Sequence, residues 1–136
     1  MDHGAALAFV RSNRRGVLAT RRRDGGVQMS PVVAAVDAQN RVVISTREGA
    51  MKTLNLRRDP HATLCTFTDR FFGAWRTVEG TVEILSLPEA LEPLVDYYRL
   101  TSGEHPDWED YRLAMHRERR VLVRITVERS GPTRTG

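Results

Sequence analysis

Six short stretches of β-branched and apolar residues recur along the chain, and they constrain the fold more than any other feature. In the last of them Val121, Val123, Ile125 and Val127 occupy every second position, the pattern of a strand with one buried face. Because turns or single short helices separate these stretches, most neighbouring strands are expected to pair in the antiparallel sense. The predicted strands cover residues 16–20, 27–36, 41–46, 61–68, 75–85 and 120–127.

Short helices are expected at the margins of this sheet. They cover residues 2–13, 50–58 and 108–116, with a further helix after Glu89. The segment from Ser86 to Glu89 has the spacing of a capping box, in which the serine hydroxyl and the glutamate side chain satisfy free N–H groups at a helix start. Six strands with marginal helices predict a small closed or split barrel in a mainly β domain.

Two residues interrupt the predicted strands. Pro31 lies inside the second strand and has no N–H for a sheet hydrogen bond, so we expect an edge, a bulge or a contact between a ligand and the backbone there. Gly80 lies inside the fifth strand and predicts a kink.

The length and composition indicate one globular domain. The chain has 136 residues, which we divide into a domain over 1–128 and a polar tail over 129–136. It carries 21 basic and 17 acidic residues, and Lys52 is its single lysine. An arginine-rich chain with a pI near 10 favours an anionic partner. The basic residues are scattered among acidic ones and form no known nucleic-acid-binding module, so no nucleic acid is expected.

The sequence predicts a cytoplasmic location. No stretch of about 18 apolar residues and no signal-peptide pattern occurs, so neither a membrane nor secretion is expected. Cys65 is the one cysteine, and its apolar, β-branched neighbours favour a small buried hydrophobe over a reactive thiol.

The usual catalytic motifs are absent. The chain has no nucleophile elbow, no P-loop and no dinucleotide-binding glycine motif. Its four histidines form no metal-binding pair, so no metal site is expected. No residue stands out as a catalytic acid, base or nucleophile. Either a cofactor supplies the chemistry or the protein is not an enzyme.

One segment does carry a functional pattern. The third strand ends in Ser45 and Thr46, and a short loop leads to a helix start at Ala50, Met51 and Lys52. Hydroxyl groups at a strand end, free N–H groups at a helix start and an ammonium group together can bind a phosphate.

The order of motifs resembles that of a known family. The pattern comprises a first hairpin over 16–32, the Ser45–Thr46 pair, Lys52 eight residues before Pro60, and a strand that contains residues 77–80. It is similar to the pyridoxamine 5'-phosphate oxidase-like, flavin-binding split barrels, and the likeness spans about residues 5 to 128. The resemblance implies a six-stranded antiparallel split barrel with Greek-key-like order, a homodimer, and a lysine that holds the cofactor phosphate at the position of Lys52.

Within that family the chain looks most like the actinobacterial branch that depends on the deazaflavin coenzyme F420. The segments over 55–60, 97–99, 103–108, 111–112 and 119–122 carry this likeness. F420 is strongly anionic, with a phosphodiester and an oligoglutamate tail, which suits an arginine-rich chain. True pyridoxamine 5'-phosphate oxidases carry a basic residue beside the lysine and an Arg-x-His segment near the C-terminus. Here Met51 is the neighbour and the Arg-x-His segment is absent, which argues against that substrate. Ala50 stands where the F420 branch often has a basic residue, and Arg47 is the candidate to replace it.

The resemblance implies an F420-dependent reductase that transfers a hydride to a small unsaturated organic acceptor. An FMN-dependent oxidoreductase and a non-catalytic carrier of flavin, F420 or a haem-like ligand stay open as alternatives. The expected cofactor-binding residues are Gln28, Ser30, Pro31, Val32, Ser45, Thr46, Met51, Lys52, Asn55 and Trp75. Among them, Lys52 and the two hydroxyls would hold the phosphate, the second strand would line the ring, and Asn55 could brace the tail.

Overall fold

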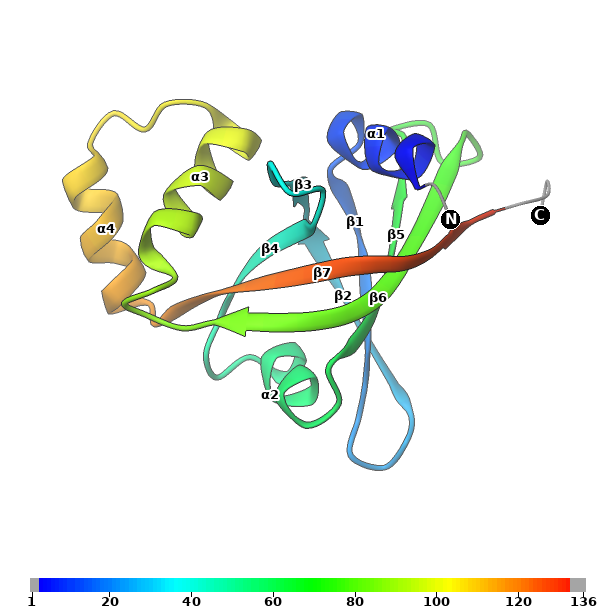
Figure 1. Cartoon of the computed structure of the whole chain (residues 1–136), viewed down its shortest axis with the longest axis horizontal. Helices are drawn as coiled ribbons and strands as arrows, with labels where there is room; N and C mark the ends of the chain where they lie inside the picture. The colour runs from blue at the N-terminus through cyan, green and yellow to red at the C-terminus, as the bar shows by residue number, and fades with distance from the viewer. Residues whose placement is uncertain (1–2, 133–136) are drawn as a thin grey trace.

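Seven antiparallel strands form one sheet, which curls into a half-barrel with the helices at its margins (Figure 1). The computed structural model describes residues 3–132. The part of the predicted tail over 133–136 therefore lies outside the described residues. The strands are β1 (Arg15–Arg21), β2 (Val27–Val33), β3 (Ala35–Val36), β4 (Val42–Arg47), β5 (His61–Phe67), β6 (Trp75–Leu85) and β7 (Arg120–Gly131).

The expected count of six strands is wrong, because the predicted strand over 27–36 is two strands. The chain leaves β2 at Ala34 and enters β3, and the order of strands is β2-β1-β5-β6-β7-β4-β3. β2 and β3 thus lie at opposite ends of the sheet. The curl of the sheet brings these ends close together, with β2 approaching β4, so a single residue suffices to connect them.

The strand order is Greek-key-like. β5, β6 and β7 are neighbours in the sheet, and β4 lies beside β7 although the chain continues from β4 to β5. The helix α2 (Met51–Arg58) lies in the connection from β4 to β5. It begins after a three-residue loop at the end of β4, and this connection builds the site described below.

Two of the helices cover the ends of the half-barrel. In Figure 1, α1 (Gly4–Ser12) lies above the curled sheet and α2 lies below it. Leu7 and Val10 from α1 and Leu56 from α2 join the main core inside the curl. Because Leu18 and Leu64 in that core are fully buried, the interior of the half-barrel is filled by side chains.

A second core lies on the outer side of β3, β4 and β7. There α3 (Leu91–Ser102) and α4 (Trp108–Arg117) pack against the sheet. Leu94 and Val95 from α3 meet Val43 and Leu122 from the strands. The expected capping box is wrong. The helix begins at Leu91, its N-cap Ala90 has no side-chain cap, and the Ser86 hydroxyl accepts a hydrogen bond from Arg57 at 2.9 Å.

The kink expected at Gly80 is confirmed. The register of β6 against β7 shifts between Glu79 and Gly80. A Cβ atom on Gly80 would lie 1.8 Å from the carbonyl oxygen of Thr126, so the two strands approach too closely there for any other residue. β7 continues to Gly131, beyond the predicted end at Val127, because it pairs with β6 again after the shift.

Candidate functional site

A cleft of about 810 Å³ opens where β1, β2, β4, α2 and α3 meet. One end is apolar and is lined by Gly16, Val17, Pro31, Val32, Val33 and Phe67. The other end is polar and basic, and it is lined by Ser45, Thr46, Arg47, Ala50, Lys52 and Arg120. Tyr97 and Arg15 complete the lining, so no acidic side chain and no histidine faces this cleft within residues 3–132.

Half of the ten residues expected from the sequence lie in this cleft. They are Pro31, Val32, Ser45, Thr46 and Lys52. The strand end and the helix start that carry the hydroxyl groups and the lysine therefore meet as the sequence predicts. The other expected residues, Gln28, Ser30, Met51, Asn55 and Trp75, do not line it.

Lys52 is a half-buried cation with no partner. Its ammonium group forms no hydrogen bond and no ion pair with another described residue. Burial lowers the pKa of Lys52, and the positive charge of Arg120 lowers it further. An anion bound beside Lys52 would oppose both effects, because an opposite charge favours the ammonium form.

The start of α2 adds hydrogen-bond donors beside Lys52. Ala50 is the N-cap residue, and no side chain caps the helix. The Thr53 hydroxyl donates to the carbonyl of Arg47 at 2.6 Å, which ties the first turn to the end of β4. The free N–H groups of the first turn and the helix dipole favour an anion at this point.

Two arginines flank the lysine, but one carboxylate already engages both. Arg120 Nε donates to Glu118 Oε1 at 2.9 Å, and Arg47 Nη2 lies 3.6 Å from the same oxygen. Glu118 thus orients the two guanidinium groups and balances part of their charge. Lys52 is left as the uncompensated cation at the basic end of the cleft.

The open edge of β2 forms the apolar end of the cleft. The backbone bonds from Ala34 to Arg14 and from Arg22 to Gly26 flank the β1–β2 ladder. Because hydrogen-bonded pairs alternate in an antiparallel ladder, the even-numbered residues of β2 bond to β1 and the odd-numbered ones face the edge. Pro31 is therefore at an edge position, as expected, where its missing N–H leaves no gap in the ladder.

Tyr97 fixes one end of that edge to α3. Its hydroxyl donates to the carbonyl oxygen of Val33 at 2.6 Å. Burial raises the pKa of Tyr97. The ring of Tyr97 therefore stands as a fixed wall between β2 and the basic end of the cleft.

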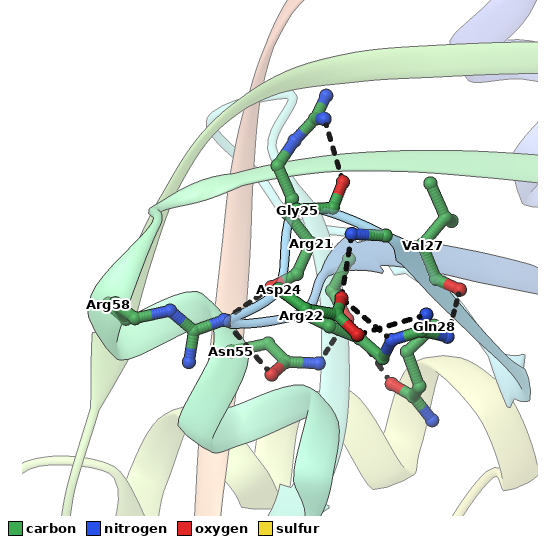
Figure 2. Close-up of polar contacts among 10 residues, drawn as sticks. Arg21, Arg22, Asp24, Gly25, Val27, Gln28, Asn55 and Arg58 are labelled. Atoms are coloured by element: carbon green, nitrogen blue, oxygen red, sulfur yellow. Dashed lines mark hydrogen bonds and ion pairs between the residues drawn. The ribbon is translucent and has the colours of Figure 1, made fainter.

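Gln28 and Asn55 belong to a polar network that docks α2 on the β1–β2 hairpin (Figure 2). The buried Asn55 donates from Nδ2 to the Thr20 hydroxyl at 3.2 Å, and that hydroxyl donates to Gln28 Oε1. Arg58 donates to the carbonyl oxygen of Arg21 at 2.6 Å and to Asn55 Oδ1. These contacts position the helix that carries Lys52.

The remaining three expected residues lie elsewhere. Ser30 faces the barrel interior across from Leu18, and its hydroxyl is buried with no partner among the described residues. Met51 is exposed at the start of α2. Trp75 is paired with Phe67 on the outer side of β5 and β6.

Sequence reasoning missed Tyr97, Arg120 and Phe67 as lining residues. Tyr97 lies beside the apolar stripe of its helix. A large aromatic residue with a polar group at such a place could have indicated a residue that lines a binding site. Arg120 and Phe67 gave no such signal, because their proximity to Lys52 and Pro31 arises only from the pairing of distant strands.

Two kinds of site are absent from residues 3–132. No group of three or more His, Cys, Asp or Glu residues is placed to hold a metal ion. None of the helices there combines the length and the apolarity that crossing a membrane requires.

Comparison with known proteins identifies the family. The family model described as pyridoxamine 5'-phosphate oxidase matches residues 3–133. The structure of a conserved hypothetical protein, Rv2991 from Mycobacterium tuberculosis, is similar with a TM-score of 0.76 and 30% sequence identity. That match covers 96% of this chain and 82% of the Mycobacterium protein.

Two more distant structures share the fold alone. A protein described as an F420 reductase has a TM-score of 0.68 at 18% identity, over 88% of this chain and 90% of that one. A haem-binding protein from Mycobacterium smegmatis has a TM-score of 0.69 at 18% identity, over 92% of this chain and 50% of that one. One fold therefore accommodates an F420 enzyme and a haem-binding protein, and the site has to distinguish between them.

Proposed function

The chain belongs to the pyridoxamine 5'-phosphate oxidase family, and from this premise we propose that it is an F420-dependent reductase of a small unsaturated organic acceptor. The observation that carries the proposal is the unpartnered Lys52 at the uncapped start of α2, beside Ser45 and Thr46. Such an arrangement suits a phosphate, and the apolar β2 edge next to it suits a flat ring.

The residues at the basic end fit a cofactor phosphate. Lys52 supplies a charge that no described residue neutralises, and the N–H groups of the α2 first turn supply directional donors. Ser45 and Thr46 add hydroxyl groups at the end of β4. An anion there would also offset the repulsion between Lys52 and Arg120.

The apolar end would orient the ring and keep water away from one face. Pro31, Val32 and Val33 present backbone groups and apolar surface along the open edge of β2, and Phe67 closes that end. The chemistry that a bound, reduced F420 supplies is donation of a hydride from its C5 carbon to an electrophilic carbon of the acceptor. The protein would contribute position and exclusion of water.

The proton that must follow the hydride would come from solvent. None of the described residues that line the cleft is a His, Asp, Glu or Cys. The Tyr97 hydroxyl already donates its proton to the Val33 carbonyl. We therefore assign no catalytic acid or base to this chain.

The preference for F420 over FMN rests on the sequence resemblance and on the basic end of the cleft, where Lys52, Arg47 and Arg120 suit a strongly anionic cofactor. FMN has a phosphate as well and is the main alternative. A carrier that binds a cofactor without turnover is the second alternative, since the haem-binding structure has the same fold.

We propose that the protein acts as a homodimer in the cytoplasm. Within residues 3–132 no helix covers the outer side of β1, β2, β5 and β6 (Figure 1), and Met29 is 67% and Trp75 40% exposed there. Val17, Pro31 and Phe67 lie on this same face and line the cleft. A second copy seated on the face would cover its apolar surface and complete the wall of the cleft.

The experiment mixes the purified protein with reduced F420 and a panel of enones, imines and tetrapyrroles, and follows the return of the oxidised cofactor's absorbance. Acceptor-dependent oxidation that Lys52→Met slows, and that Arg23→Met leaves unchanged, supports the proposal. Turnover with FMN instead would assign the FMN alternative. Binding of F420 with no oxidation by any acceptor would assign the carrier.

A further inference from the structure

A second cleft of about 660 Å³ continues from the first, between the start of β1 and α3. The two clefts share Arg15, Val33, Phe67 and Tyr97 as lining residues. The second cleft touches none of Ser45, Thr46, Ala50 or Lys52. The two therefore join at the apolar end, away from the phosphate-binding end.

Two arginines in the second cleft have no partner. Neither the Arg14 nor the Arg15 side chain forms a hydrogen bond or an ion pair with another described residue. The Nε atom of Arg14 is buried and has no acceptor among residues 3–132. A buried N–H donor without an acceptor is costly, so a carboxylate that engages this guanidinium group from the cleft would be favoured.

The other charged residues of this cleft do not compensate the two arginines. Arg11 is a third cation, and its guanidinium group is engaged with Asn40 Oδ1 at 2.8 Å. Asp69 is the one acidic residue among the lining, and it forms no ion pair with Arg14 or Arg15. The cleft therefore carries a net positive charge, and two of its guanidinium groups have no partner among the described residues.

Aromatic rings form the wall beside these arginines. Phe67, Tyr97 and Tyr98 line the cleft. Tyr97 is held by its bond to Val33, and Tyr98 packs edge-on against Trp108 at a centroid distance of 5.7 Å. A rigid aromatic wall next to guanidinium donors suits a planar, unsaturated molecule with a carboxylate, because guanidinium groups bind carboxylates in two parallel hydrogen bonds.

We propose that this second cleft binds the carboxylate of the acceptor, and that Arg14 and Arg15 hold it. This inference rests on the proposed function, and it narrows the acceptor to planar organic acids. The acidic tail of the cofactor is the other source of a carboxylate. Since that tail is attached at the phosphate, it would leave the site at the Lys52 end, whereas this cleft opens beyond the ring.

The test measures carboxylate binding without any cofactor. The protein is titrated with 2-naphthoate and with its neutral counterpart 2-naphthalenemethanol, and the NMR signal of the Arg14 Nε–H group is followed. We expect naphthoate to bind about ten-fold more tightly than the alcohol and to shift the Arg14 signal. Equal affinity for the two probes, or an Arg14 signal that does not move, would overturn the proposal.

Variants separate the two arginines from general charge. Arg14→Met and Arg15→Met should each weaken naphthoate binding about ten-fold and leave alcohol binding unchanged. Arg23→Met is the matched control, because Arg23 is exposed at the tip of the β1–β2 hairpin and lines neither cleft. An equal loss in Arg23→Met would reduce the effect to net charge and refute the assignment. Should Arg14→Met not fold, Arg15→Met and the wild-type NMR titration decide.

A parallel titration with F420 distinguishes the two sources of the carboxylate. If Arg14→Met weakens F420 binding and leaves naphthoate binding intact, the cleft belongs to the cofactor tail and the proposal is wrong. If the wild-type protein binds naphthoate through Arg14 but binds neither F420 nor FMN, the carboxylate site stands and the proposed function fails.

Discussion

Replacement of Lys52 by methionine is the perturbation that bears most directly on the phosphate site. Methionine keeps an unbranched stem of similar length, so packing against α2 is retained and the charge is removed. Arg47 and Arg120 stay in place, but Glu118 already engages both. The loss should therefore fall on the contact between Lys52 and the phosphate.

The magnitude follows from the position of Lys52. A hydrogen bond to a charged group contributes about 1.5–3 kcal/mol. Lys52 is half-buried and two arginines remain nearby, so the lower half of that range applies. A loss of about 1.5–2 kcal/mol raises the dissociation constant of the cofactor roughly 10- to 30-fold.

The assay is a titration with F420, and separately with FMN, that follows tryptophan fluorescence. Trp75 is 40% exposed across from Phe67 and is placed to report on the apolar end of the cleft. Arg23→Met serves as the control for net charge. If the affinities of Lys52→Met for both cofactors stay within two-fold of the wild-type values, Lys52 does not bind the phosphate and the reasoning fails.

Three further expectations concern pH, the core and the assembly. Lys52 binds the phosphate in its charged form, so the affinity for the cofactor should fall as the pH rises through the lowered pKa of Lys52. An arginine keeps its charge over this range, so Lys52→Arg should remove the fall. Calorimetry at a series of pH values checks this, and the same pH profile for the wild type and the variant would contradict it. Gly80→Ala should lower the free energy of unfolding by at least about 1–3 kcal/mol, because the new Cβ atom would overlap the carbonyl of Thr126. Gly49→Ala is the control, since a Cβ atom there has no neighbour within 4 Å, and its stability should stay near that of the wild type. Urea unfolding measures both, and equal unfolding midpoints for the two variants would refute the close approach of the strands at Gly80. Light scattering should give the mass of a dimer for the wild type and of a monomer for the double variant Met29→Glu, Trp75→Glu, and a wild-type monomer would exclude the assembly.

Most elements of the fold follow from local sequence patterns. β6 spans Trp75–Leu85, the predicted range, because period-two alternation and the kink at Gly80 are both local features. The end of α2 at Arg58 follows from Pro60, which excludes helical backbone in the residue before it. The split of the second strand at Ala34 could not be predicted, since the run of small and β-branched residues is continuous and only the curl of the sheet breaks it.

The candidate site was predictable only in part. Ser45, Thr46 and Lys52 lie close together in the chain, so one strand-to-helix connection brings them into one place. The hydroxyl of Ser86 bonds to Arg57 instead of capping its own helix, because a partner distant in sequence competes for it. Asn55 likewise serves the packing of α2 on the hairpin, a role that depends on Thr20 and has no local signature.

The proposed function requires that the cleft beside Lys52 binds a phosphate-bearing deazaflavin. The most direct test is calorimetric titration of the wild-type chain with F420 and, in a separate cell, with FMN. We expect micromolar binding of F420 and weaker binding of FMN. Tighter binding of FMN would move the protein to the flavin-dependent alternative. Binding of neither cofactor would contradict the claim and leave only the family and the fold.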